Sequence, residues 1–124
     1  MTVVPVFKIG KDDVSVFHGT LPFVTFGEVM VRETPADEER PERTRLVQLS
    51  MAGSEFTLAM GLARLGIPAA YITRVPDNPY GKSVRNIARE QGINTDFFVW
   101  APKTEPIGRM IYEIGRTPRK DTGI

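Results

Sequence analysis

Residues 51–66, MAGSEFTLAMGLARLG, decide the fold class of this chain because they join a polar beginning to a long apolar helix. From Glu55 to Leu65 the apolar side chains recur at helical spacing around nearly the whole circumference, a pattern that predicts a buried helix. Gly66 ends the pattern, as a C-terminal cap would. The segment therefore predicts a core helix, and its beginning raises a separate question of function.

The beginning of this helix is equipped to bind a polar ligand. Gly53 has no side chain, so a ligand could approach the backbone there, and Ser54 can cap the helix or offer its hydroxyl. Thr57 adds a polar side chain in the first turn, and the N–H groups of that turn favour hydroxyls or an anion. Ordinary capping also accounts for a Gly-Ser pair, so both explanations stay open at this point.

Predicted strands and helices alternate around this segment. Runs of β-branched and aromatic residues predict strands, and the amphipathic run KSVRNIAREQ predicts a second helix. The predicted strands cover residues 23–32, with Gly27 as a bulge or bend, and residues 46–49, 68–75 and 96–100; the second helix covers residues 82–91. This order is typical of right-handed βαβ units around a mostly parallel sheet, so we expect an α/β fold.

Two further segments lie outside this alternation. Residues 34–45, TPADEERPERTR, predict a solvated surface loop. Residues 107–113 alternate enough to predict an exposed edge strand, and residues 115–124 contain no recognisable terminating element. A parallel domain with so few strands is unusual, and we expect only part of such a domain here.

The composition narrows the function classes. With 124 residues the chain is long enough for one domain, and 41% hydrophobic and 25% charged residues are typical of a soluble globular protein. Sixteen basic and fifteen acidic residues give a net charge of +1, which offers no electrostatic case for nucleic acid or an acidic membrane surface. The chain has no cysteine and one histidine, so disulfides, thiolate chemistry and multi-histidine metal clusters are excluded.

The N-terminal residues carry no functional signal of their own. Residues 1–20 are weakly patterned and are expected to form an extension, with His18 in a solvated loop. Pro5 and the polar run that follows interrupt the beginning, which lacks the pattern of a signal peptide or a membrane span. We expect a cytoplasmic protein.

Several motifs, taken together and in order, resemble one family. AGSEFTLAMGLARLG, VPDNPYGKSV and QGINTDF resemble the N-terminal half of the ribokinase-like (PfkB) carbohydrate kinases, most of all the 2-dehydro-3-deoxygluconate kinases. FGEVMVRETP is similar to their first strand and its turn toward a lid, and IGRMIYEIG to the returning lid strand. The resemblance covers residues 23–124. It implies that residues 21–124 form the N-terminal part of a ribokinase-like α/β/α sandwich with a small β-sheet lid.

The resemblance also implies an activity and a set of ligands. Members of the family transfer the γ-phosphoryl group of ATP to a sugar hydroxyl with Mg²⁺, and their lid often forms a dimer clasp. We therefore expect ATP, Mg²⁺, a sugar or sugar acid, and a homodimer through the lid. By the same resemblance, the substrate-binding residues are Gly53, Ser54, Thr57, Glu28, Arg32 and Tyr112.

Two of these residues have alternative explanations. Arg32 could bind a sugar-acid carboxylate, which a guanidinium matches bidentately, or it could form a surface ion pair with Glu28 or Glu33. Tyr112 could cover the ligand from the lid, or it could simply pack within the lid.

Two departures from the family pattern limit the assignment. Thr57 stands where family members typically carry asparagine, and a single hydroxyl offers fewer hydrogen bonds than an amide. The family's catalytic aspartate, in a Gly-Ala-Gly-Asp motif, has no counterpart here; Asp121 precedes a superficially similar Thr-Gly pair but follows the lid strand. The ATP site built near that motif is also absent. We therefore assign no catalytic residue and no metal ligand, and expect the chain alone to be inactive.

Two other function classes are alternatives to a kinase. A non-catalytic binding or dimerisation module derived from such a kinase is the alternative, because an unfinished parallel sheet leaves an open edge and an uncovered apolar face. A non-kinase nucleotide-binding domain is disfavoured, because the chain has no Walker A sequence and no Gly-x-Gly-x-x-Gly after a strand.

Overall fold

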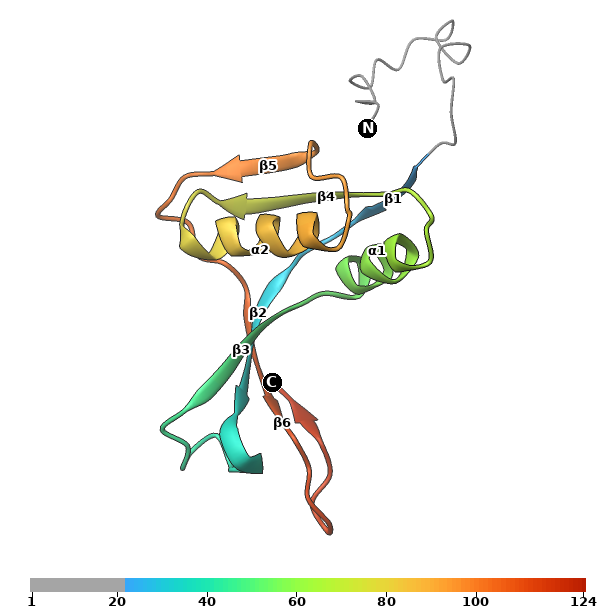
Figure 1. The fold of residues 1–124 in the computed structure, drawn as a ribbon. Helices are drawn as coiled ribbons and strands as arrows, with labels where there is room; N and C mark the ends of the chain where they lie inside the picture. Colours follow the sequence, from blue (N-terminus) through green and yellow to red (C-terminus); the bar gives the residue numbers. More distant parts are fainter. Residues whose placement is uncertain (1–21) are drawn as a thin grey trace, which may run out of the picture.

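Two β-sheets organise residues 22–124, the part of the chain that the computed structural model describes (Figure 1). The first, which we call the parallel sheet, has the order β1-β4-β5. It consists of β1 (Phe23–Phe26), β4 (Ala69–Pro76) and β5 (Phe98–Ala101). The second, which we call the lid sheet, has the order β3-β2-β6-β7. It consists of β3 (Val47–Ala52), β2 (Met30–Pro35), β6 (Arg109–Glu113) and β7 (Thr122–Gly123). The predicted extension at residues 1–20, with His18, lies outside the described residues.

Two helices cover one face of the parallel sheet. Helix α1 (Ser54–Arg64) precedes β4, and α2 (Pro79–Glu90) connects β4 to β5. Both helices contribute to one buried cluster, which contains Phe56 and Ala59 of α1, Val84 and Ala88 of α2, and Tyr71, Val75 and Phe98 of the sheet. All pairs in this sheet are parallel, which confirms the predicted βαβ units. Neither helix in residues 22–124 has the length and apolar character that crossing a membrane requires.

The prediction of one strand over residues 23–32 is wrong, because the chain crosses there from one sheet to the other. The β1 ladder ends at Gly27, whose N–H donates to the Ile72 carbonyl at 3.2 Å. The carbonyl of Gly27 then accepts a hydrogen bond from the buried Tyr71 hydroxyl at 2.9 Å. The backbone is thus held at Gly27, where a bend was predicted, and β2 begins in the lid sheet at Met30.

The prediction that α1 is buried all round is also wrong. Phe56 and Ala59 are fully buried, whereas Leu58 is 49% exposed and Leu65 is 78% exposed. Within residues 22–124, only the parallel sheet and the neighbouring core pack against this helix, so one side of an almost wholly apolar helix stays in contact with solvent. On the opposite face of the parallel sheet, the side chain of Phe26 is likewise 76% exposed. The described chain therefore holds one helical layer of the expected sandwich.

The structure shows how each helix begins. Gly53 occupies the N-cap position of α1 without a side-chain cap, and Ser54 is the first helical residue. The Ser54 hydroxyl donates to the Glu55 carboxylate at 3.3 Å, so it does not cap the helix. Helix α2 begins at Pro79 rather than at residue 82, because Asn78 accepts hydrogen bonds from two backbone N–H groups of the first turn.

The lid sheet extends away from the helix-covered sheet (Figure 1). β6 is not the exposed edge strand that was predicted, since it pairs in parallel with β2 and antiparallel with β7. Asp121 stabilises the turn between β6 and β7 by accepting a hydrogen bond from the Gly115 N–H at 2.6 Å. The short β7 therefore covers the outer edge of β6. The predicted loop at residues 34–45 begins too early, because Thr34 and Pro35 are the last residues of β2, and Ala36–Glu38 then form a short 3-10 helix.

Candidate functional site

The two faces of the lid sheet carry different chemistry. Arg32 of β2 pairs with Ser50 of β3 and with Met110 of β6, so these three side chains point to the same face. Tyr112 lies two residues beyond Met110 and shares that face. We call it the Arg32 face. Glu33, the next residue of β2, points to the opposite face.

Arg32 is held by two uncharged groups. Its Nε donates a hydrogen bond to the Ser50 Oγ at 3.0 Å. Its guanidinium carbon lies 5.7 Å from the centroid of the Tyr112 ring, within the range of a cation–π contact. The structure therefore brings together two of the predicted site residues, Arg32 and Tyr112, and adds Ser50.

The predicted ion pair of Arg32 with Glu28 or Glu33 is wrong. Within residues 22–124, no carboxylate lies within ion-pair distance of the Arg32 guanidinium. Glu33 instead pairs with Arg109 on the opposite face of the sheet. Because neighbouring residues of a strand alternate between faces, Glu33 points away from Arg32. Among the described residues Arg32 therefore forms no ion pair, and its guanidinium can receive an anion.

Tyr112 is fixed by the turn that follows it. Its hydroxyl donates to the Asp121 carboxylate at 2.8 Å, and this hydrogen bond raises the pKa of the Tyr112 phenol. The backbone N–H of Gly115 and, second, the Tyr112 hydroxyl lower the pKa of Asp121. At neutral pH the ring beside Arg32 is therefore a neutral phenol that donates to an ionised carboxylate.

The other predicted residues gather where the lid meets the parallel sheet. A Cβ atom at Gly53 would lie 2.6 Å from the carbonyl oxygen of Glu28, so only glycine allows this approach between the end of β3 and the crossover to β2. Ser54 and Thr57, in the first turn of α1, are exposed, as is Glu28. Among the described residues, no side-chain hydrogen bond or ion pair joins this group to Arg32.

The two groups are nevertheless aligned along one strand. Ser50, which contacts Arg32, precedes Gly53 by three residues at the end of β3. At the rise of an extended strand this is a separation of about 10 Å. One sugar-sized ligand with its hydrogen bonds can span such a distance. The Arg32 face and the beginning of α1 therefore form one candidate site at the base of the lid.

A cavity of about 340 Å³ lies beside this base, at the carboxyl ends of β1 and β4. Ligands of open α/β sheets bind at this edge. Glu28 and the buried Thr73 line the cavity together with Arg74 and Glu105. Arg74 and Glu105 form a two-bond ion pair, with Nη2 donating to Oε1 at 2.6 Å. This pair raises the pKa of Arg74 and lowers that of Glu105, so both groups stay charged.

Sequence reasoning missed Ser50, Asp121 and the Arg74–Glu105 pair. Each depends on a partner far along the chain or across a turn, and no local periodicity indicates such a partner. The pairing of Ser50 with Arg32 follows only from the register between β2 and β3. Ser50 follows the predicted strand at residues 46–49 and precedes the start of α1 by four residues, and it carried no separate signal.

Tyr71 makes the stability of this crossover sensitive to high pH. Burial raises the pKa of the Tyr71 phenol above its ordinary value of 10.0, and the charges of Glu55 and Glu28 raise it further. A phenol whose pKa is higher in the folded state stabilises the fold fully below its unfolded-state pKa. That contribution is then lost as the pH rises through the folded-state value.

We therefore expect the free energy of unfolding to fall above pH 10.0. Urea denaturation over a series of alkaline pH values measures this decrease, and Tyr71→Phe should make it shallower. Equal pH dependence in the variant and the original chain would contradict the assignment of the effect to Tyr71.

The geometry first defines a class of protein. The ribokinase-like fold has three features that this chain shares. They are a helix-covered parallel sheet, a lid sheet whose strand β2 follows the first strand of the parallel sheet, and a polar site between the two sheets. The sequence profile of the pfkB family carbohydrate kinases matches residues 22–121, and the chain belongs to this family.

Individual relatives agree with this assignment. The chain is 36% identical, over 100 residues, to the 2-dehydro-3-deoxygalactonokinase of Haloferax volcanii, an alignment that covers 81% of this chain and 31% of the relative. Its structure resembles the crystal structure of 2-dehydro-3-deoxygluconokinase from Thermotoga maritima, with a TM-score of 0.79 and 31% identity. That similarity covers 85% of this chain and 32% of the other.

A third relative shares the fold at lower identity. It is an uncharacterized sugar kinase from Pyrococcus horikoshii in complex with ATP, with a TM-score of 0.72 and 18% identity. The similarity covers 82% of this chain and 33% of that kinase. The chain thus spans about a third of the length of the relatives it matches.

Proposed function

We propose that this chain provides the sugar-binding and lid elements of a kinase that transfers the γ-phosphoryl group of ATP to a hydroxyl of a sugar acid. The observation that carries the proposal is the state of Arg32. Its guanidinium is held by Ser50 and Tyr112, and no carboxylate of residues 22–124 neutralises it. A guanidinium in this state is suited to a planar carboxylate.

Two relatives support a sugar acid rather than a neutral sugar. The Haloferax volcanii and Thermotoga maritima proteins are kinases of 2-dehydro-3-deoxy sugar acids, and each is more than 30% identical to this chain. We propose a substrate similar to 2-dehydro-3-deoxygluconate, whose carboxylate Arg32 binds.

The beginning of α1 would bind the other end of such a substrate. Gly53 leaves the backbone accessible, and Ser54 and Thr57 expose hydroxyls that can donate to and accept from sugar hydroxyls. Glu28 can accept a hydrogen bond from a further hydroxyl, and Tyr112 can cover the ligand from the lid. Because Thr57 has one hydroxyl where the family typically has an amide, it makes fewer of these contacts.

We propose that ATP and Mg²⁺ are bound by parts of the enzyme other than these residues. The ATP complex of the Pyrococcus horikoshii kinase, which shares this fold, supports ATP as the phosphoryl donor. Residues 22–124 contain no group of three or more His, Cys, Asp or Glu side chains that could hold a metal ion. These residues therefore bind and orient the substrate, and phosphoryl transfer needs further groups.

A second candidate function is a lid-mediated dimer, with or without catalysis. On the face of the lid sheet opposite Arg32, Leu49 is 50% exposed and Val47 is 39% exposed. Exposed apolar side chains on a strand favour association with another surface. We propose a homodimer in which the lid sheets of two copies cover these residues. Sedimentation of Leu49→Lys as a monomer where the original chain is a dimer would support this second candidate, and an unchanged mass would oppose it.

Replacing Arg32 with methionine tests the proposed substrate class. Loss of one charge-assisted bidentate contact is expected to raise the Kd for 2-dehydro-3-deoxygluconate by about tenfold to a hundredfold. Isothermal titration calorimetry with the 124-residue chain measures this change. The amide of the same acid, which lacks the charge, should bind the original chain as weakly as the acid binds the variant.

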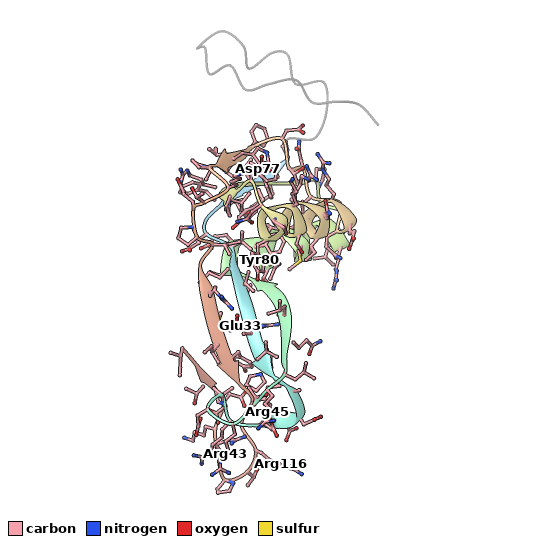
Figure 2. The ribbon with its side chains drawn as sticks, turned by 90° about the vertical axis from the view of Figure 1, so that its left-hand side faces the viewer. Glu33, Arg43, Arg45, Asp77, Tyr80 and Arg116 are labelled. Carbon is pink, nitrogen blue, oxygen red and sulfur yellow. The ribbon has the colours of Figure 1, made fainter. Side chains whose placement is uncertain are left out.

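Arg43→Met is the matched control. Arg43 lies at the tip of the lid with Arg45 and Arg116, far from the base of the sheet (Figure 2). This control removes the same charge and should leave the Kd unchanged. Equal affinity of the Arg32→Met variant and the original chain for the acid would overturn the proposed role of Arg32.

A further inference from the structure

We propose that Ser50 is a positioning residue that decides which edge of the Arg32 guanidinium receives the anion. The carboxylate would be bound end-on, by the two terminal nitrogens, and not along the side that contains Nε. The identity of the anion as a sugar acid rests on the proposed function. The orientation of Arg32 rests only on contacts within the lid sheet.

Arg32 keeps free hydrogen-bond donors on its terminal nitrogens. A guanidinium has five N–H donors: one on Nε and two on each terminal nitrogen. A planar carboxylate can pair with Nε and one terminal nitrogen, or with both terminal nitrogens. Because Nε already donates to the Ser50 Oγ at 3.0 Å, the side-on arrangement has lost one of its donors. Arg32 makes no other side-chain hydrogen bond within residues 22–124, so its terminal nitrogens keep their donors.

Ser50 holds Arg32 through an uncharged hydroxyl. Ser50 lies directly opposite Arg32 in the antiparallel pair of β2 and β3, where side chains are close neighbours. Its hydroxyl accepts a hydrogen bond without adding charge, so the guanidinium keeps its full positive charge. A carboxylate at the same place would hold Arg32 equally well but would neutralise it, as Glu33 does for Arg109 on the opposite face.

The Tyr112 ring restrains one face of the Arg32 guanidinium. The Tyr112 ring lies 5.7 Å from the guanidinium carbon, and Asp121 anchors the ring through the Tyr112 hydroxyl at 2.8 Å. Asp121 is itself held by the Gly115 N–H at 2.6 Å. Arg32 is thus restrained at Nε by β3 and on one face by β6, and the turn before β7 supports that second restraint.

These restraints predict selectivity for planar anions. A carboxylate offers the two terminal nitrogens two charged oxygens in parallel, whereas a sugar hydroxyl offers them one uncharged oxygen. Because the guanidinium is already oriented, little side-chain entropy is lost when the anion binds. Ser50 therefore contributes to selectivity without touching the substrate.

The experiment follows the Arg32 N–H resonances by ¹⁵N NMR in the full 124-residue chain, with sodium acetate as the probe anion. In the original chain, acetate is expected to shift the terminal N–H resonances more than the Nε–H resonance. A larger shift at Nε–H would overturn the end-on arrangement. This result does not depend on whether the chain binds any sugar.

Three variants at position 50 test the positioning role. Ser50→Ala should speed solvent exchange of the Arg32 Nε–H by about tenfold and raise the Kd for 2-dehydro-3-deoxygluconate by a similar factor. Ser50→Thr keeps a hydroxyl and should restore both values. Ser50→Asp should protect Nε–H yet weaken acid binding further, because the carboxylate neutralises Arg32. Ser83→Ala, on α2, is the control and should change neither value.

The outcomes separate the two proposals. Unchanged Nε–H exchange in Ser50→Ala would overturn the role of Ser50, whatever the chain binds. If exchange follows the predicted order but no variant, nor the original chain, binds the sugar acid, the positioning role stands and the proposed substrate fails. Should Ser50→Ala not fold, Ser50→Thr and Ser50→Asp decide. Unchanged acid affinity in Ser50→Thr together with weaker affinity in Ser50→Asp is expected if the charge at position 50 acts through Arg32, and equal affinity in the two variants would overturn the role of Ser50.

Discussion

Replacing Phe56 with alanine is expected to lower the free energy of unfolding by about 3–5 kcal/mol, the range for truncating a buried aromatic residue. Phe56 is 0% exposed, and its ring centroid lies 5.4 Å from that of Tyr71. Tyr71 in turn packs edge-on against Phe98 at 6.0 Å. The three rings join α1, β4 and β5, so the cavity left by alanine would loosen all three elements. Urea denaturation followed by far-ultraviolet circular dichroism measures the change.

Leu58→Ala is the matched control for this prediction. Leu58 lies two residues further along α1 and is 49% exposed. Its truncation removes a side chain of comparable apolarity but leaves no closed cavity. We expect a loss below about 1 kcal/mol. Similar losses for the two variants would mean that the core of this chain is not organised around the Phe56–Tyr71 contact.

Replacing Gly81 with alanine is the second substitution with a large expected effect. A Cβ atom at Gly81 would collide with the carbonyl oxygen of Pro76, a backbone atom that cannot rotate away. Helix α2 would have to shift, although Asn78 holds its beginning through the N–H groups of Tyr80 and Gly81 at 3.0 and 3.2 Å. We expect the free energy of unfolding to fall by about 3 kcal/mol, at the upper end for overpacking.

Gly61→Ala provides the opposite expectation with the same chemical change. Gly61 lies inside α1, and a Cβ atom there would meet nothing within 4 Å among the described residues. Alanine should therefore raise the free energy of unfolding by about 0.5–1 kcal/mol through helix propensity alone. Thermal unfolding of both variants compares the two signs. A stabilising Gly81→Ala would show that α2 does not lie against Pro76 in solution.

Local sequence was sufficient for the elements whose signal is periodic. The predicted helices at residues 55–65 and 82–91 correspond to α1 and α2, and β1, β4 and β5 pair in parallel. The order of motifs also indicated the family, which the profile match confirms. These features depend on residues close together in the chain, so a linear pattern is enough to identify them.

Contacts across the chain decided the features that the sequence could not indicate. Residues 23–32 have the composition of one strand, yet the Tyr71 hydroxyl, 44 residues away, holds the chain at Gly27 and divides the run between two sheets. The apolar pattern of α1 predicted burial, but burial depends on which neighbours are present, and only one side of this helix has them in the described chain.

The same distinction applies to the candidate site. By itself, the sequence indicated the α/β fold class through local periodicity. Its resemblance to the family, carried by the order of its motifs, implied an arginine and a tyrosine on lid strands. Only the tertiary structure decided that Arg32 meets Ser50 and Tyr112. The physical reason is strand register, which sets the face and the neighbours of every side chain and is fixed by pairing between segments distant in sequence.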